Sequence, residues 1–107
     1  MRILDSEMTY IDTYSADIKR LCTLHNVKSL YAFGSVVSDQ MTEKSDIDFL
    51  VDFNTADIKN YADNYFDFKF SLQEILKRPI DLIEEKAIKN PYFKQVVNSQ
   101  RKLVYGH

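Results

Sequence analysis

The sequence predicts an α/β (α+β) fold in which a small mixed β-sheet is flanked by helices. Amphipathic helical segments alternate with short apolar segments in the order α-β-α-β-α-β-α-β, a pattern typical of helices packed on a sheet. Of the 107 residues, 45% are hydrophobic and 28% are charged, which is the composition of an ordinary globular protein. We therefore expect residues 1–107 to form a single domain.

One of the four helical segments is short, since the polar residues 35–45 are predicted to hold a turn or a single helical turn around Val36 and Val37. Three longer segments have the spacing of apolar side chains that predicts an amphipathic helix. They cover residues 9–25, residues 56–77 and a stretch that starts at Asn90. Thr9 resembles a helix cap for the first, Asn54 with Thr55 for the second, and Asn90 for the third. The predicted apolar faces consist of Ile11, Tyr14, Ile18, Leu21, Cys22 and His25; of Tyr61, Tyr65, Phe68, Leu72 and Ile75; and of Tyr92, Phe93, Val96 and Val97.

Four short segments are predicted to be strands, at residues 27–33, 46–53, 80–83 and 102–105. In the second of these the apolar side chains alternate with acidic ones, so they occupy opposite faces. The apolar face consists of Ile47, Phe49, Val51 and Phe53, and the other face carries Asp46, Asp48 and Asp52. This strand is therefore predicted to pack on the core with one face and to present carboxylates on the other.

Asp46 and Asp48 are two residues apart on this strand, so their side chains point the same way from Cα atoms about 6.5 Å apart. Two such carboxylates repel each other, and a divalent cation removes the repulsion. Oxygen ligands suit Mg²⁺ or Mn²⁺, and neither histidine is near the pair in the sequence. Asp81, on the next predicted strand, is the natural third ligand, and three carboxylates can hold two metal ions for phosphoryl or nucleotidyl transfer.

Gly34 and Ser35 precede the two aspartates in the spacing Gly-Ser-x10-Asp-x-Asp. A glycine lets the backbone approach a phosphate closely, and the amides and hydroxyl that follow it can donate hydrogen bonds to phosphate oxygens. The chain has two glycines, too few for a Rossmann fingerprint or a Walker A loop. We therefore predict a phosphate-binding turn opposite the carboxylates.

The pattern FGSx10DxD, followed by an aspartate in PIDLIEE, resembles the minimal nucleotidyltransferases of the DNA polymerase beta superfamily over residues 20–107. It is most similar to the MNT-type antitoxins, which are paired with HEPN-domain ribonuclease toxins. The resemblance implies a polymerase-beta-like nucleotidyltransferase fold. It also implies an enzyme that transfers AMP from ATP to a tyrosine hydroxyl of its toxin partner, with which it forms a hetero-oligomer.

The resemblance also implies a role for each matching residue. Asp46 and Asp48 would bind both Mg²⁺ ions, and Asp81 would bind the catalytic one and could accept the proton of the attacking hydroxyl. Gly34 and Ser35 would hold the β- and γ-phosphates of the nucleotide.

One departure from the family pattern leaves other functions open. Family loops often read GSRARG, whereas this loop reads GSVVSDQMTEKS, in which Lys44 is the one basic residue and therefore the candidate phosphate contact. An inactive member that neutralises its toxin by binding alone is one alternative. A transferase acting on RNA or on a small molecule is another.

Composition restricts the environment and the partners. Cys22 is the only cysteine, so no internal disulfide can form. No signal peptide and no membrane span is expected, which predicts a cytoplasmic protein. The net charge of −2 argues against direct nucleic-acid binding. The charge is distributed unevenly: residues 1–67 contain six basic and twelve acidic residues, whereas residues 68–107 contain eight basic and four acidic residues. The basic last third is either an ordinary solvated surface or a surface that faces a triphosphate or an acidic partner.

Overall fold

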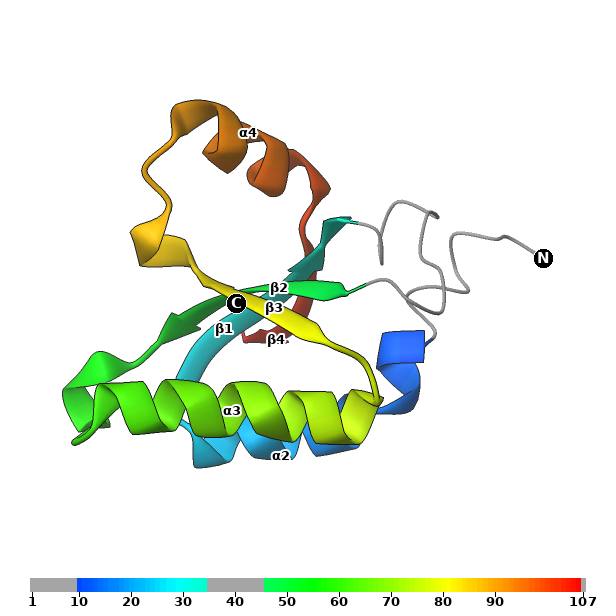
Figure 1. Ribbon diagram of the computed structural model, residues 1–107, viewed down its shortest axis with the longest axis vertical. Helices are drawn as coiled ribbons and strands as arrows, with labels where there is room; N and C mark the ends of the chain where they lie inside the picture. The colour runs from blue at the N-terminus through cyan, green and yellow to red at the C-terminus, as the bar shows by residue number, and fades with distance from the viewer. Residues whose placement is uncertain (1–9, 35–45, 107) are drawn as a thin grey trace.

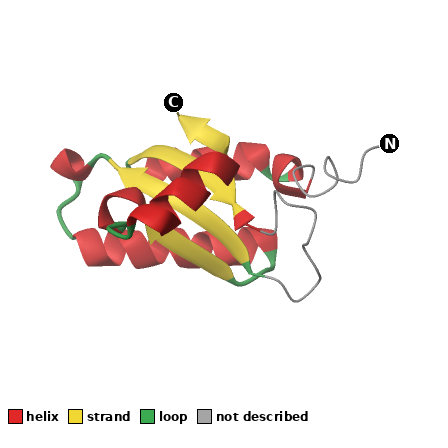
Figure 2. Cartoon of the chain, turned by 90° about the horizontal axis from the view of Figure 1, so that it is seen from above, coloured by secondary structure: helices red, strands yellow, loops and turns green. Residues whose placement is uncertain are grey.

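The computed structural model describes residues 10–34 and 46–106, and these form three layers (Figure 1). A four-stranded sheet lies in the middle. Helices α2 (Ser15–Leu24) and α3 (Tyr61–Leu76) cover one face, and helix α4 (Pro91–Gln100) stands over the other. Figure 2 shows from above how α4 crosses over the strands. The expected sheet flanked by helices is confirmed.

The strands are β1 (Val27–Phe33), β2 (Ile47–Phe53), β3 (Ile80–Glu84) and β4 (Lys102–Gly106), in the spatial order β3-β2-β1-β4. Strand β1 pairs antiparallel with β2 and β4, whereas β2 pairs parallel with β3. A parallel pair needs a crossover connection, and α3 supplies it. The sheet is therefore mixed, with β2 inside it and β3 at its edge.

Two groups of buried apolar side chains lie on opposite faces of the sheet. The larger group joins the sheet to α2 and α3, and it contains Ile47, Phe49, Val51 and Phe53, as the alternation in the sequence predicts. The smaller group lies under α4 and consists of Phe33, Leu50 and Val97. Burial raises the pKa of Cys22, a member of the larger group, to about 12, so its thiol is a core group.

The first helix is shorter than predicted, because Tyr14 interrupts it. Residues 10–13 are helical, but the Tyr14 amide donates to the Ile11 carbonyl instead of continuing the α-helical pattern. The predicted face is correct on both sides of this break, since Ile11 and Ile18 are both buried. His25 caps the end of α2, where its Nδ1 donates to the Leu21 carbonyl at 2.8 Å. Thr9, the predicted cap, lies outside the described residues.

Helix α3 begins five residues later than predicted. Its cap is Asn60, whose side chain accepts a hydrogen bond from the Asp63 amide, whereas Asn54 precedes a short 3₁₀ turn, η2 (Thr55–Asp57). Two asparagines six residues apart are equally good caps by residue type, and the chain uses the second. The helix ends at Leu76, and the C-cap residue Lys77 has a left-handed backbone with φ of 58°.

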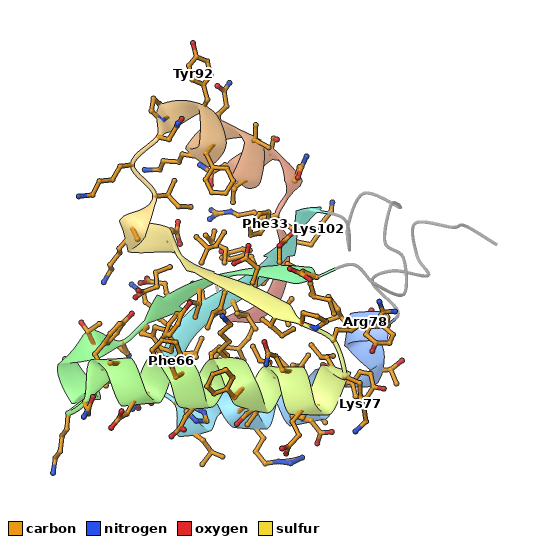
Figure 3. All side chains as sticks on the ribbon, in the orientation of Figure 1. Phe33, Phe66, Lys77, Arg78, Tyr92 and Lys102 are labelled. Carbon is orange, nitrogen blue, oxygen red and sulfur yellow. The ribbon has the colours of Figure 1, made fainter. Side chains whose placement is uncertain are left out.

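Helix α4 begins as predicted but does not bury the predicted face. The Asn90 side chain accepts from the amides of Tyr92 and Phe93, and Pro91 occupies the first turn. Only Val97 is buried, however, while Tyr92 is 81% exposed and points away from the sheet in Figure 3. The helix rests on a small apolar group, and this covers fewer side chains than a full core would.

A second 3₁₀ turn, η3 (Glu85–Ala87), joins β3 to α4. No helix in the described ranges is both long enough and apolar enough to cross a membrane.

Candidate active site

Asp48 lies on the inner strand β2, on the face of the sheet that carries α4. Its neighbours Ile47 and Phe49 are fully buried on the opposite face, and Leu50, two residues further on, belongs to the group under α4. Asp48 is half-buried and is in register with Phe33 of β1. Backbone pairing on both sides therefore fixes the position of this carboxylate.

Asp81 is the direct neighbour of Asp48 in the sheet. The two residues are register partners in the parallel pair of β2 and β3, where adjacent strands are about 4.8 Å apart. The side chain of Asp81 is exposed. The structure thus brings together two of the predicted site residues that are 33 positions apart in the sequence.

Asp46 immediately precedes β2 and is also exposed. The charge of Asp46 also acts on Asp48. The pKa of Asp48 is raised to about 6 by burial first, then by Asp81 and then by Asp46. Each neighbouring negative charge disfavours ionisation of Asp48. The three predicted carboxylates therefore form one electrostatic unit at this end of the sheet.

Gly34 follows the last residue of β1 and lies beside Asp48, and a glycine is favoured there for two reasons. Its φ of +76° is in the region that disfavours side chains, and a Cβ atom at this position would overlap the Oδ2 atom of Asp48. The sequence suggested glycine for close approach of a phosphate. The structure shows a second close approach, that of the Asp48 carboxylate to the backbone.

Asp52 shares the face of β2 that carries Asp48 but belongs to a different environment. It forms an ion pair with Lys86 at 3.5 Å, and its charge acts on Glu84. The pKa of Glu84 is raised by burial and then by Asp52, and Lys86 opposes this effect. Asp52 therefore interacts with Lys86 and Glu84, which lie beyond Asp48 along the strands.

The donor set fits a hard divalent cation, although the protein alone does not enclose one. Within residues 10–34 and 46–106, no three His, Cys, Asp or Glu side chains form a group that could hold a metal ion, and no enclosed pocket is present. Magnesium is usually bound through one or two carboxylates, with waters and substrate phosphates as the remaining ligands. The pKa of Asp48 is raised by burial and then by two neighbouring carboxylates, and a bound cation would favour its ionised form.

Two of the predicted nucleotide contacts, Ser35 and Lys44, lie outside the described residues. Two polar side chains of α3 that the sequence did not single out reach β3 instead. The Tyr65 hydroxyl donates to the Leu82 carbonyl, and the Gln73 Oε1 atom accepts from the Ile80 amide. Helical periodicity gives no signal for such contacts, because it counts Tyr65 only as a member of an apolar stripe.

Comparison with known proteins identifies the family. Residues 18–104 match the family described as "Nucleotidyltransferase domain". Two proteins of Methanocaldococcus jannaschii, named "Putative protein adenylyltransferase MJ1379" and "Putative protein adenylyltransferase MJ0128", are 36% and 39% identical to this chain over 81 residues. Each alignment covers 76% of this chain and 78% of the relative.

Solved structures share the fold at lower identity. A structure described as a "putative minimal nucleotidyltransferase" aligns with a TM-score of 0.72 and 22% identity, over 92% of this chain and 93% of the other. A "toxin-antitoxin with AMP-PNP" aligns with a TM-score of 0.68 and 23% identity, over 87% and 73%.

A Shewanella oneidensis complex of a tri-AMPylated HEPN toxin with an MNT antitoxin aligns with a TM-score of 0.61 and 21% identity, over 90% and 72%. The family match, the relatives and the fold all indicate the same kind of protein. The chain belongs to the nucleotidyltransferase domain family and is a nucleotidyltransferase.

Proposed function

We propose that this nucleotidyltransferase transfers AMP from ATP to a tyrosine hydroxyl of a HEPN-type toxin, and that the modification neutralises the toxin. The observation that carries the proposal is the pairing of Asp48 with Asp81 on a nucleotidyltransferase fold. Relatives with 36% and 39% identity carry the name of protein adenylyltransferases, which favours a protein acceptor. The shared fold with toxin–antitoxin complexes favours a toxin as that protein.

In this proposal Asp46, Asp48 and Asp81 hold Mg²⁺, as two ions, with Mn²⁺ as a substitute. The bound cations would neutralise the triphosphate and make its α-phosphorus easier to attack. The half-buried Asp48 provides the fixed anchor, and the exposed Asp46 and Asp81 can turn towards ions that arrive with the nucleotide. In this proposal the carboxylates supply some of the cation ligands, and the nucleotide phosphates would supply others.

The group transfer needs an acceptor for one proton. The acceptor hydroxyl oxygen forms a bond to the α-phosphorus, the bond from that phosphorus to the bridging oxygen breaks, and pyrophosphate leaves. The hydroxyl proton passes to a carboxylate, and Asp81 is the candidate because its side chain is exposed on the edge strand. Catalysis in this scheme consists of positioning and charge neutralisation.

Gly34, Ser35 and Lys44 are proposed to bind the β- and γ-phosphates. Gly34 lies beside Asp48, so a phosphate held at this turn would be next to the carboxylates. The hydroxyl of Ser35 and the ammonium of Lys44 would add donors. We further propose that residues 1–107 act as one domain, in a hetero-oligomer with the toxin that supplies the acceptor.

The test is transfer to a protein partner, measured by mass. The purified protein is incubated with ATP, Mg²⁺ and a HEPN-domain protein from the same genome, and both proteins are analysed by intact mass spectrometry. We expect AMP-sized increments on the partner that disappear with Asp48→Asn. Asp52→Asn is the matched control, because it makes the same change on the same strand and face but at an ion-paired position.

Three outcomes would contradict the proposal. A stable complex that neutralises the toxin without changing its mass would show that binding alone suffices. AMP incorporation into RNA or a small molecule, with none on the partner, would assign a different acceptor. Transfer that survives Asp48→Asn would remove the carboxylates from the chemistry.

A further inference from the structure

Helix α3 contacts the edge strand β3 on both sides of Asp81. The Ile80 amide donates to Gln73 Oε1 at 3.3 Å, and the Leu82 carbonyl accepts from the Tyr65 hydroxyl. Both α3 side chains are half-buried. The two backbone groups that flank Asp81 are thus held by the same helix.

These two contacts fall on the side of β3 that has no neighbouring strand among the described residues. The N–H and C=O groups of alternate residues in a strand point to the same side, so Ile80 and Leu82 direct theirs away from β2. Such outward groups on an edge strand usually remain free to bond with water or with another chain. Here they are bonded to α3, and Asp81 lies between them with its own backbone turned towards β2.

We propose that Tyr65 and Gln73, which we call the β3 clamp, are positioning residues that hold the Asp81 carboxylate in register with Asp48 for cation and nucleotide binding. The inference rests on the proposed function of the carboxylates. It assigns to α3, through these two side chains, a role in the site on the opposite face of the sheet.

The asymmetry between the two strands explains why a clamp is needed. Asp48 is fixed by β1 on one side and by β3 on the other, whereas β3 has, in the part of the chain that the structure describes, a sheet partner on one side alone. Without the clamp, the strand that carries Asp81 would be held by a single ladder of hydrogen bonds and by the packing of Ile80 and Leu82 in the core. An edge strand in that condition opens more readily than an inner one.

The Tyr65 hydroxyl is suited to the role because it stays protonated. Burial raises the pKa of Tyr65, and the charge of Asp81 raises it further, so the phenol remains a hydrogen-bond donor at physiological pH. Its ring is packed edge-on against Phe66, with 5.1 Å between the ring centroids. Tyr65→Phe therefore removes the donor and keeps the ring.

The test uses the full chain and two measurements. Hydrogen exchange by NMR reports how often β3 opens, and Mn²⁺ titration in the presence of a non-hydrolysable ATP analogue reports cation affinity. In Tyr65→Phe we expect amide exchange at residues 80–82 to be roughly fivefold faster, while exchange in β1 stays unchanged. We expect Mn²⁺ affinity to fall roughly tenfold, as it does when a group that orients a metal ligand is removed.

Gln73→Met tests the second contact with a side chain of similar length, and the double variant should show the larger loss of affinity. Tyr61→Phe is the matched control: it removes a hydroxyl from the same helix, one turn earlier. Within the described residues, the Tyr61 hydroxyl makes no hydrogen bond. We expect this control to keep the wild-type exchange rates and Mn²⁺ affinity. Thermal unfolding of each variant shows that it is folded at the temperature of the titration.

The outcomes separate the clamp from the proposed function. If the wild type binds Mn²⁺ and Tyr65→Phe and Gln73→Met bind it equally well, the clamp is overturned even if they are less stable. Exchange that is unchanged in the double variant also overturns it. If the wild type itself binds no Mn²⁺ with the nucleotide analogue, the proposed function is overturned, and the positioning role fails with it.

Discussion

Asp48 and Asp81 are register partners on adjacent strands, but the two strands are held in different ways. Strand β2 is paired on both sides, and its inward face is buried completely against α2 and α3. Strand β3 is paired on one side and fastened on the other by Tyr65 and Gln73. A site that must bind a cation and then release a product thus combines one rigid ligand with one whose position depends on a helix.

The largest effect expected from breaking this pair is on catalysis. Asp48→Asn and Asp81→Asn each remove a charge that the proposed site uses, and we expect AMP transfer to fall by roughly 10² to 10³-fold. Initial rates with ATP and the toxin partner measure the loss. Asp52→Asn should retain the wild-type rate within about twofold, and an equal loss there would show that acidity of the face, not these two positions, matters.

The largest effect on stability is expected from a substitution that disturbs the contact between Gly34 and Asp48. Gly34→Ala places a Cβ atom at a positive φ and against the Asp48 carboxylate. We therefore expect the free energy of unfolding to fall by about 2–4 kcal/mol. Urea unfolding followed by circular dichroism measures this. The cost should be smaller by about 1 kcal/mol in an Asp48→Ala background, where the carboxylate is absent. Equal costs in both backgrounds would show that the backbone angle alone is responsible.

The burial of Asp48, together with repulsion from Asp81 and Asp46, predicts how stability depends on pH without metal. The folded state raises the pKa of Asp48 from 3.8 to about 6, so it favours the protonated form, and this contribution to stability is lost as the pH rises through 6. Asp48→Asn should therefore stabilise the metal-free protein by about 1 kcal/mol at pH 7 and by almost nothing at pH 4. Urea unfolding in EDTA at the two pH values checks this. A gain of equal size at both would contradict the raised pKa.

The smallest effect is expected at the opposite end of the same two strands. Lys86 is 70% exposed in its ion pair with Asp52, and such pairs contribute little. We expect Lys86→Met to change stability by less than about 0.5 kcal/mol and to leave AMP transfer unchanged. A loss of activity would extend the functional surface beyond the carboxylate end of the sheet.

The sequence was sufficient for the elements whose burial follows a simple period. Alternation along β2 predicted which side chains enter the core, and it placed Asp46 and Asp48 on the other face. Asp81 was predicted on a neighbouring strand, but its register opposite Asp48 depends on where α3 ends and how Lys77 turns the chain. Spacing in the sequence does not contain that information.

Other features depend on contacts between distant residues, and the sequence pattern could not show them. The exposed side of α4 follows from the small apolar group beneath it, so Tyr92 and Val96 look like core residues until the sheet is in place. The hydrogen bonds of the Tyr65 hydroxyl and the Gln73 amide can be recognised only when the position of β3 is known. The close approach of the Asp48 carboxylate to the Gly34 backbone is likewise visible only in the folded chain.

The order of the strands also has a consequence for how the chain folds. Strand β1 pairs with β2, which follows it by 13 residues, but it also pairs with β4, as Leu30 does with Tyr105, across most of the described chain. Closing so long a loop costs entropy before it brings any contact, so we expect β4 to join the sheet late, after the rate-limiting step. Destabilising changes in β4, such as Val104→Ala, should then accelerate unfolding and leave the refolding rate nearly unchanged in stopped-flow measurements. The carboxylate end, made by β1, β2 and β3, would form before the sheet is closed.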